Sequence, residues 1–132
     1  MRFEIYTDYA IRALRLLHVN NGKVMTIMEI ALAIDTTSPI FGKIAGKLRR
    51  AGMLKTIKGQ KGGFVLGRPA NEISIYDVYI CMEGELRLNK CLETGELCEH
   101  GKRVDCKVHG MVYGLQEEMI EKMSSVSIAD IV

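Results

Sequence analysis

Long hydrophobic runs are missing from this chain of 132 residues. No apolar stretch approaches the roughly 18 residues that a membrane span requires, and the first four residues do not resemble a signal peptide. We therefore expect a cytoplasmic protein that has no membrane partner. Hydrophobic residues make up 48% of the chain and charged residues 26%, a balance that supplies a core and excludes a disordered chain.

Acidic residues are absent from the whole segment between Thr36 and Asn71. The same segment contains eight basic residues, which are Lys43, Lys47, Arg49, Arg50, Lys55, Lys58, Lys61 and Arg68. Its charge is therefore +8, whereas the remainder has 10 bases and 16 acids and a charge of −6. The near-neutral total of +2 conceals a basic block, which predicts nucleic acid as the first partner to test.

Cysteine is absent outside one short stretch, which holds all four thiols: Cys81, Cys91, Cys98 and Cys106. In a reducing cytoplasm such a cluster indicates metal or redox chemistry rather than disulfides. The tight C-x₂₋₄-C pairs typical of structural zinc are also missing. An iron–sulfur cluster, zinc and plain reduced thiols remain open from the spacing, while Cys81, beside Tyr79, Ile80 and Met82, is interpreted as a small buried hydrophobe.

Apolar periodicity predicts a mainly α-helical chain with one small β-hairpin. The expected helices cover about 6–19, 27–34, 39–51, 74–82 and 107–123, with strands at about 54–58 and 64–66 and a final turn at 128–131. A capping box of Thr26 with Glu29 is expected at the second helix. Three short helices followed by a basic hairpin are the parts of a winged helix-turn-helix.

Basic side chains recur on one side of the third helix, because Lys43, Lys47 and Arg50 are spaced by four and three residues, away from Ile44 and Leu48. Such a helix fits the major groove, and a basic glycine-rich hairpin tip can approach phosphates closely. The alternative is a solvated basic helix with a structural turn. The predicted DNA-binding residues are Thr26, Thr37 and Ser38 at helix starts, Lys43, Lys47 and Arg50 on the third helix, and Lys58, Gln60, Lys61 and Gly62 at the tip.

Residues 48–54 (LRRAGML) and 58–66 (KGQKGGFVL) resemble the recognition helix and wing of the Rrf-two family of bacterial transcription regulators. The resemblance is to the iron–sulfur, IscR- and NsrR-like branch of that family. Further similar pieces are residues 7–14 (TDYAIRAL), 73–78 (ISIYDV), 82–84 (MEG) and 127–131 (SIADI), so that it covers nearly the whole chain. It implies a homodimer with crossing C-terminal helices on a palindromic DNA operator, which matches the apolar stripe between Val108 and Met123.

The resemblance also implies that Cys91, Cys98 and Cys106 hold an iron–sulfur cluster. Two candidates exist for the fourth ligand. Asp8 of the partner subunit would complete a four-iron cluster, which is slightly favoured because Thr7-Asp8-Tyr9 matches as a block; His109 would complete a two-iron cluster. Otherwise Asp8 is a first-turn carboxylate favoured by the helix dipole, and His109 is an exposed helix residue.

The predicted organisation is a winged helix-turn-helix domain over residues 1–83, a cysteine-bearing cluster-binding loop over 84–106, and a dimerisation helix with a C-terminal turn over 107–132. The predicted function is transcription regulation in response to cluster status, iron, nitric oxide or redox state. A cluster-free regulator that responds through a protein partner or cysteine oxidation is the alternative. An enzyme or a small electron-transfer protein is disfavoured, because a nucleophile–base pair and a phosphate-binding loop are both missing. Whether the protein represses or activates stays open.

Overall fold

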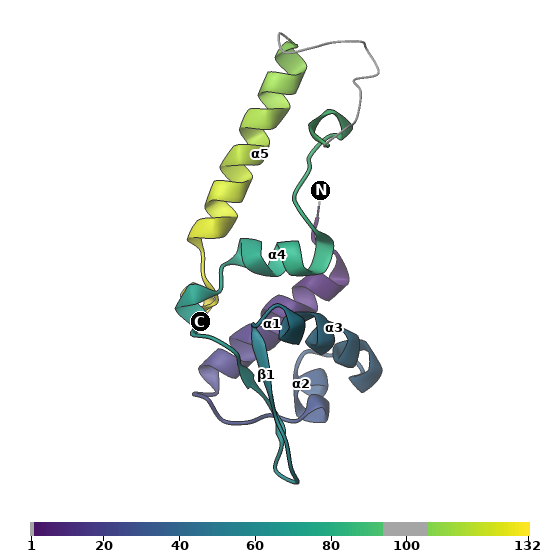
Figure 1. The fold of residues 1–132 in the computed structure, drawn as a ribbon, viewed down its shortest axis with the longest axis vertical. Coiled ribbons are helices and arrows are strands. Elements are labelled where there is room, and N and C mark those ends of the chain that lie inside the picture. Colours follow the sequence, from purple (N-terminus) through teal and green to yellow (C-terminus); the bar gives the residue numbers. More distant parts are fainter. Residues whose placement is uncertain (1, 94–105) are drawn as a thin grey trace.

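The computed structural model describes residues 2–93 and 106–132 of the chain (Figure 1). Along these residues lie α1 (Ile5–Val19), α2 (Ile27–Ala33), α3 (Ser38–Arg50), β1 (Leu54–Ile57), β2 (Gly63–Leu66), η1 (Ala70–Glu72), α4 (Ile75–Glu83), η2 (Lys90–Leu92), α5 (Lys107–Ser125) and η3 (Ile128–Ile131), where η marks a 3₁₀ helix. The expectation of a mainly α-helical chain with a small hairpin is confirmed. The two central 3₁₀ helices were not foreseen, because three residues are too few to show a period.

The second and third helices begin at threonines that satisfy their free N–H groups. Thr26 Oγ1 accepts a hydrogen bond from the Glu29 N–H at 3.1 Å, and Thr37 Oγ1 accepts one from the Ile40 N–H at 3.4 Å. The expected capping box at Thr26 is only half formed, because the Glu29 carboxylate accepts from the Thr26 hydroxyl instead of from its backbone N–H. These caps fix where the two helices start.

The hairpin pairs β1 with β2 in antiparallel register, from Leu54 opposite Leu66 to Ile57 opposite Gly63. Met25 extends this pairing, since it exchanges two backbone hydrogen bonds with Phe64, at 2.8 and 3.1 Å. A Cβ atom at Gly63 would lie 2.3 Å from the Met25 carbonyl oxygen, so this approach requires glycine. The hairpin is thereby joined to the segment that leads into α2, and its tip projects from the molecule (Figure 1).

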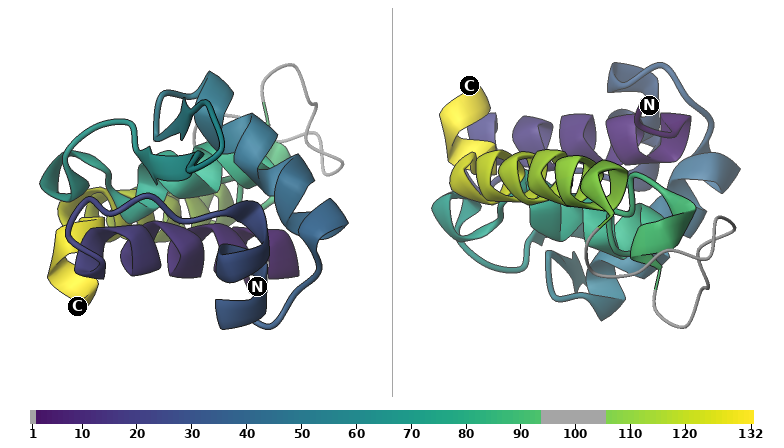
Figure 2. Two further views of the ribbon diagram at one scale, coloured as in Figure 1. Left: turned by 90° about the horizontal axis from the view of Figure 1, so that it is seen from below. Right: turned by 90° about the horizontal axis from the view of Figure 1, so that it is seen from above.

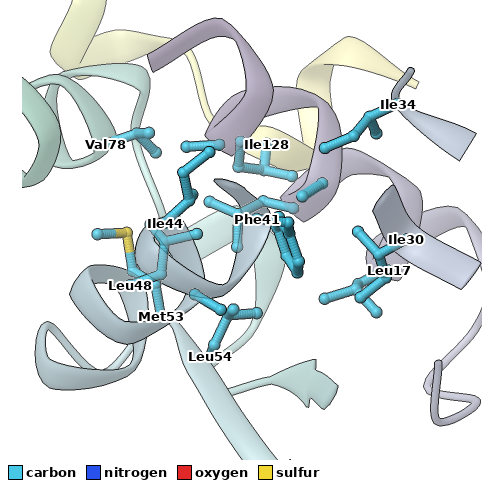
Figure 3. Close-up of a cluster of buried hydrophobic side chains, with 14 of the residues drawn as sticks. Leu17, Ile30, Ile34, Phe41, Ile44, Leu48, Met53, Leu54, Val78 and Ile128 are labelled. Carbon is cyan, nitrogen blue, oxygen red and sulfur yellow. The ribbon is translucent and has the colours of Figure 1, made fainter. Parts of the chain in front are cut away.

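One hydrophobic core joins α1, α2, α3, the hairpin and η3 (Figure 3). Its fully buried side chains include Leu14, Leu17, Ile30, Phe41, Ile44, Leu48, Met53, Val78 and Ile128. Each such side chain contributes about 1.5–3 kcal/mol relative to its exposed state. Tyr6 is exposed, whereas the neighbouring Thr7 is buried, and its hydroxyl donates to the Glu83 carboxylate.

The C-terminal part returns to this core after leaving it. Helix α4 begins with the capping box of Ser74 and Asp77, and α5 rises away from the globular part (Figure 1). The chain end then comes back: the Ile75 N–H donates to the Val126 carbonyl at 2.8 Å, and the Ile128 N–H donates to the Ile73 carbonyl at 2.9 Å. This pairing connects the end of α5 to the start of α4, and η3 packs on α1 (Figure 2).

No helix within residues 2–93 and 106–132 is long and apolar enough to cross a membrane.

Candidate functional site

The basic side chains of α3 lie on its exposed side. Lys43, Lys47 and Arg50 are exposed, whereas Ile44 and Leu48 are fully buried in the core, as the spacing predicted. No acidic residue lies in the first turn of α3, and its last turn is basic. This side of the helix therefore presents cations only, which suits a phosphate-lined groove.

The helix starts lie beside these cations. Thr26 and Thr37 are exposed, and each hydroxyl accepts a backbone N–H of its own helix. The Thr26 O–H donates to the Glu29 carboxylate, whereas the Thr37 O–H can donate to an outside acceptor. Ser38 is the first residue of α3 and is partly exposed. A helix start carries partial positive charge and free N–H groups, so phosphate oxygens are favourable partners here.

The hairpin tip supplies a second basic surface. Lys58, Gln60 and Lys61 are all exposed there. A Cβ atom at Gly62 would lie 2.2 Å from the Ile57 carbonyl oxygen, and Gly59 has a φ of +109°. Only glycine fits these two positions, so the tip conformation is set by the sequence and carries its lysines on a narrow loop.

Two of the predicted metal-ligating thiols flank the long C-terminal helix. Cys91 lies in η2, and Cys106 immediately precedes α5; both are free and partly buried. Cys98 lies outside the described residues. Within residues 2–93 and 106–132, no three His, Cys, Asp or Glu side chains are grouped closely enough to hold a metal ion.

A hydrogen bond limits the position of Cys91. The Leu88 N–H donates to Gln116 Oε1 at 2.9 Å, and η2 packs against α5 (Figure 1). Gln116 is ten residues after Cys106, or about 15 Å along the helix. Three residues of chain span at most about 11 Å, so Cys91 lies within about that distance of Leu88, which is bonded to the middle of α5.

The surroundings of the two thiols suit soft metal ligation. The Asn89 side-chain amide donates to Cys91 Sγ at 3.5 Å. Cys106 is the residue before a helix of 19 residues whose first turn contains no acid, and Lys107 follows it. N–H donors and a helix N-terminus attract the negative charge that thiolate-bound iron–sulfur clusters carry. The donor chemistry of the described residues therefore fits such a cluster.

The two candidate fourth ligands occupy different elements. Asp8, in the first turn of α1, pairs with Arg12 at 2.7 Å, and this hydrogen bond and charge raise the pKa of Arg12. The Asp8 side chain remains 41% exposed. The cluster that Asp8 is predicted to ligate would be held by the cysteines of the other subunit. His109 lies one turn after Cys106, is partly buried, and stacks on Tyr113 with 6.5 Å between ring centroids.

Cys81 lies apart from these thiols, at the contact of α4 with α3. Its thiol donates to the Lys47 carbonyl at 3.5 Å, and burial raises its pKa against the opposing charges of Lys47 and Arg50. Cys81 was expected to be buried, but it is only half-buried. The reason is its position on the rim of the α3–α4 contact, beside the exposed basic side of α3.

Three polar residues with clear structural roles were missed from the sequence. Glu83 accepts from the Glu4 N–H at 3.1 Å and from the Thr7 hydroxyl, so it caps the start of α1, whose own residues provide no side-chain cap. Gln116 and Asn89 are the other two. Gln116 interrupts the apolar stripe of α5, and a polar residue within that stripe is a sequence signal for a buried hydrogen bond. No sequence signal indicates the role of Asn89, because that role depends on the turn of η2.

A helix pair that ends in a basic recognition helix, joined to a basic hairpin, defines a winged helix-turn-helix protein of the DNA-binding class. The family model of Rrf2, described as an iron-dependent transcriptional regulator, matches residues 3–132. The chain belongs to the Rrf2 family of transcription regulators, as its sequence resemblance indicated, and not to a family of enzymes.

Individual relatives agree with this family. Protein aau3 of Rhizobium meliloti (strain 1021) is 38% identical over 97 residues, which cover 74% of this chain and 63% of the length of aau3. A protein of Aquifex aeolicus (strain VF5), provisionally named an HTH-type transcriptional regulator, is 25% identical over 132 residues, which cover 100% of this chain and 92% of that protein.

Solved structures show the same fold. The global cysteine regulator CymR (YrzC) of B. subtilis superimposes with a TM-score of 0.79 at 20% identity, over 99% of this chain and 95% of CymR. IscR of T. potens gives a TM-score of 0.74 at 23% identity, over 99% of this chain and 85% of that one. At these identities the likeness concerns the fold alone.

Proposed function

We propose that this protein is a homodimeric regulator that binds a palindromic DNA operator and senses cluster status, iron, nitric oxide or redox state through a bound iron–sulfur cluster. Cys91, Cys98 and Cys106 provide three ligands. Asp8 of the partner subunit is the fourth ligand of a four-iron cluster, which we slightly favour, and His109 is the alternative for a two-iron cluster. When bound, the cluster supplies a redox-active and nitric-oxide-reactive centre.

The observation that supports the proposal is that both described cysteines of the set adjoin α5: Cys91 lies in η2, which packs against α5, and Cys106 is the N-cap residue of α5. The Leu88–Gln116 hydrogen bond holds the segment just before Cys91 against the middle of α5. Both thiols are free, and both have groups nearby that favour negative charge: the Asn89 amide for one, the helix N-terminus for the other. Two cysteines that only fill space in the packing would need neither a nearby N–H donor nor a helix N-terminus.

The proposed dimer follows from the exposed side of α5. Val108, Met111 and Leu115 recur at three- and four-residue spacing and are 50–61% exposed. A contiguous exposed apolar stripe on a long helix marks an interaction surface. A second copy of this helix covers it in our proposal, and the twofold axis then sets two recognition helices against the two halves of a palindrome.

The two proposed sites lie at opposite ends of the long axis: the hairpin tip and α2 at one end, the start of α5 at the other (Figure 1). Signal transfer therefore requires a path through the structure. The backbone bonds that join Val126 to Ile75 and Ile128 to Ile73 connect α5 to the DNA-binding core. A change in the geometry of paired α5 helices would thus alter the spacing of the recognition helices.

Anaerobic purification of the full chain tests the cluster. We expect a brown protein whose visible absorption and Mössbauer spectra show iron and sulfide. The Cys91→Ala, Cys98→Ala and Cys106→Ala variants should lose the colour, and the Cys81→Ala variant is the matched control that should keep it. Asp8→Ala and His109→Ala then identify the fourth ligand by a changed spectrum. A colourless wild-type protein with stoichiometric zinc would refute the cluster.

A second candidate function is a cluster-free regulator that responds to cysteine oxidation or to a protein partner. It is favoured by the salt bridge of Asp8 with Arg12, which already provides a partner for the proposed fourth ligand. It is also consistent with the fold shared with CymR. Full DNA binding and full response to a protein partner in a variant with Cys91, Cys98 and Cys106 all replaced by Ala would select the partner-responsive form of this function.

A further inference from the structure

The side chain of Asn89 makes two hydrogen bonds at the start of η2. Its Oδ1 accepts from the Lys90 N–H at 2.9 Å, and its Nδ2 donates to Cys91 Sγ at 3.5 Å. The first bond caps the 3₁₀ helix that carries Cys91. The second aims an N–H group directly at a sulfur atom that we propose as a metal ligand.

The orientation of this amide is determined by its neighbours. The Lys90 N–H is a donor and can be satisfied only by Oδ1, so Nδ2 must occupy the other side of the amide, toward Cys91. The reverse orientation would place two donors against each other at Lys90 and an oxygen against the thiolate. The backbone therefore fixes which end of Asn89 faces the sulfur.

We propose that Asn89 sets the reduction potential of the cluster through its hydrogen bond to the Cys91 thiolate. The inference rests on the proposed cluster-binding function and adds a residue to it. Asn89 is a positioning and tuning residue, not a ligand. Hydrogen bonds to cluster sulfurs are among the factors that set the potential of a given cluster type.

The direction of the effect follows from charge. One-electron reduction, with the electron supplied by a low-potential reductant, makes the iron–sulfur unit and its thiolate ligands more negative by one charge. A donated N–H stabilises the more negative form more strongly, because a hydrogen bond strengthens with the charge of its acceptor. Asn89 therefore favours the reduced form and raises the reduction potential.

Two substitutions separate the hydrogen bond from the helix cap. Asn89→Ser keeps a neutral side chain that can cap the Lys90 N–H, but it is one atom shorter and lacks the amide N–H that Asn89 donates to Cys91. Asn89→Asp keeps the cap as well and replaces the donor with a negatively charged oxygen. Asn71→Asp, in the distant η1, is the matched control because it introduces the same charge far from Cys91.

The experiment is an anaerobic redox titration of the cluster-loaded dimer, followed by visible absorption and electron paramagnetic resonance. Asn89→Ser should shift the reduction equilibrium about ten-fold toward the oxidised form, which for one electron lowers the midpoint potential by about 59 mV. Asn89→Asp should lower it further, and Asn71→Asp should match the wild type.

The outcomes distinguish failure of the proposed cluster from failure of the proposed role of Asn89. A colourless wild-type protein overturns both the cluster and the role of Asn89. A brown wild type whose potential is unchanged in Asn89→Ser overturns the role of Asn89 alone, even if Asn89→Asp is shifted, since that shift would then be due to charge. Equal shifts in Asn71→Asp and Asn89→Asp would overturn it as well.

Discussion

Gln116, in the middle of α5, accepts a hydrogen bond from the backbone N–H of Leu88 at 2.9 Å. Only 3% of the Gln116 residue surface is exposed, so this amide lies inside the contact between α5 and the segment after α4. The bond holds that segment against the helix three residues before Cys91. One side chain thus contributes both to stability and to the placement of a proposed ligand.

Replacement of Gln116 by Ala should destabilise the fold. The Leu88 N–H would lose its acceptor in a partly buried place, which costs about 1–3 kcal/mol in the free energy of unfolding. Chemical denaturation of the metal-free protein measures this loss. Glu117→Ala, at the adjacent exposed position, is the control and should change stability by less than about 0.5 kcal/mol. Equal effects of the two variants would contradict a specific role for Gln116.

Replacement of Lys58 or Lys61 by Ala should weaken DNA binding to all sequences alike. Each lysine at the hairpin tip neutralises one phosphate in our proposal, so a dimer loses two such contacts. The slope of log affinity against log salt concentration should then fall by about 1.8, at about 0.9 per contact. Fluorescence anisotropy with duplex DNA at several salt concentrations measures this slope. Lys122→Ala, an equal loss of charge on α5, should leave it unchanged.

Replacement of Leu115 by Glu should dissociate the dimer. Leu115 is 50% exposed in the single chain, and a carboxylate in the covered interface would be buried without a partner. We expect the dissociation constant of the dimer to rise at least about ten-fold, or about 1.4 kcal/mol, in sedimentation velocity experiments. Leu32→Glu on α2, where Leu32 is 80% exposed, introduces the same change outside the proposed interface and should remain dimeric. An unchanged Leu115→Glu dimer would rule out this surface.

Alkylation should distinguish Cys81 from the other thiols. Burial raises the pKa of Cys81, so its thiolate fraction at neutral pH is below that of an ordinary thiol. In metal-free protein it should react with iodoacetamide at least about three-fold more slowly than Cys91, and the ratio should narrow as the pH rises. Mass spectrometry of the peptides reports each rate. Lys47→Ala removes a charge that lowers this pKa, and should slow the reaction of Cys81 further.

Local features of the fold were predictable because their signals are local. The periodic apolar residues of α1 and α3, the caps at Thr37 and Ser74, and the glycines of the hairpin each determine backbone geometry within a few residues. The exposed placement of Lys43, Lys47 and Arg50 also followed from helical spacing. The apolar stripe of α5 was visible for the same reason.

Contacts between distant residues were not predictable from these patterns. The capping of α1 by Glu83 joins positions 79 residues apart, and no periodicity relates them. The half-formed box at Thr26 and the half-buried state of Cys81 likewise depend on what packs nearby. Each is decided by tertiary packing, since a side chain bonds whichever group is closest in space.

The sequence by itself determined the class of this protein: helices and a hairpin in a given order, a basic block on the third helix and the tip, and a cluster of cysteines between the core and the last helix. Only the tertiary structure decided how the segment around Cys91 is held. The hydrogen bond of Gln116 with Leu88 and the packing of η2 on α5 hold the segment that carries Cys91 against the last helix. Spacing along a chain fixes local conformation, whereas the approach of two segments is selected by the pairing of buried polar groups.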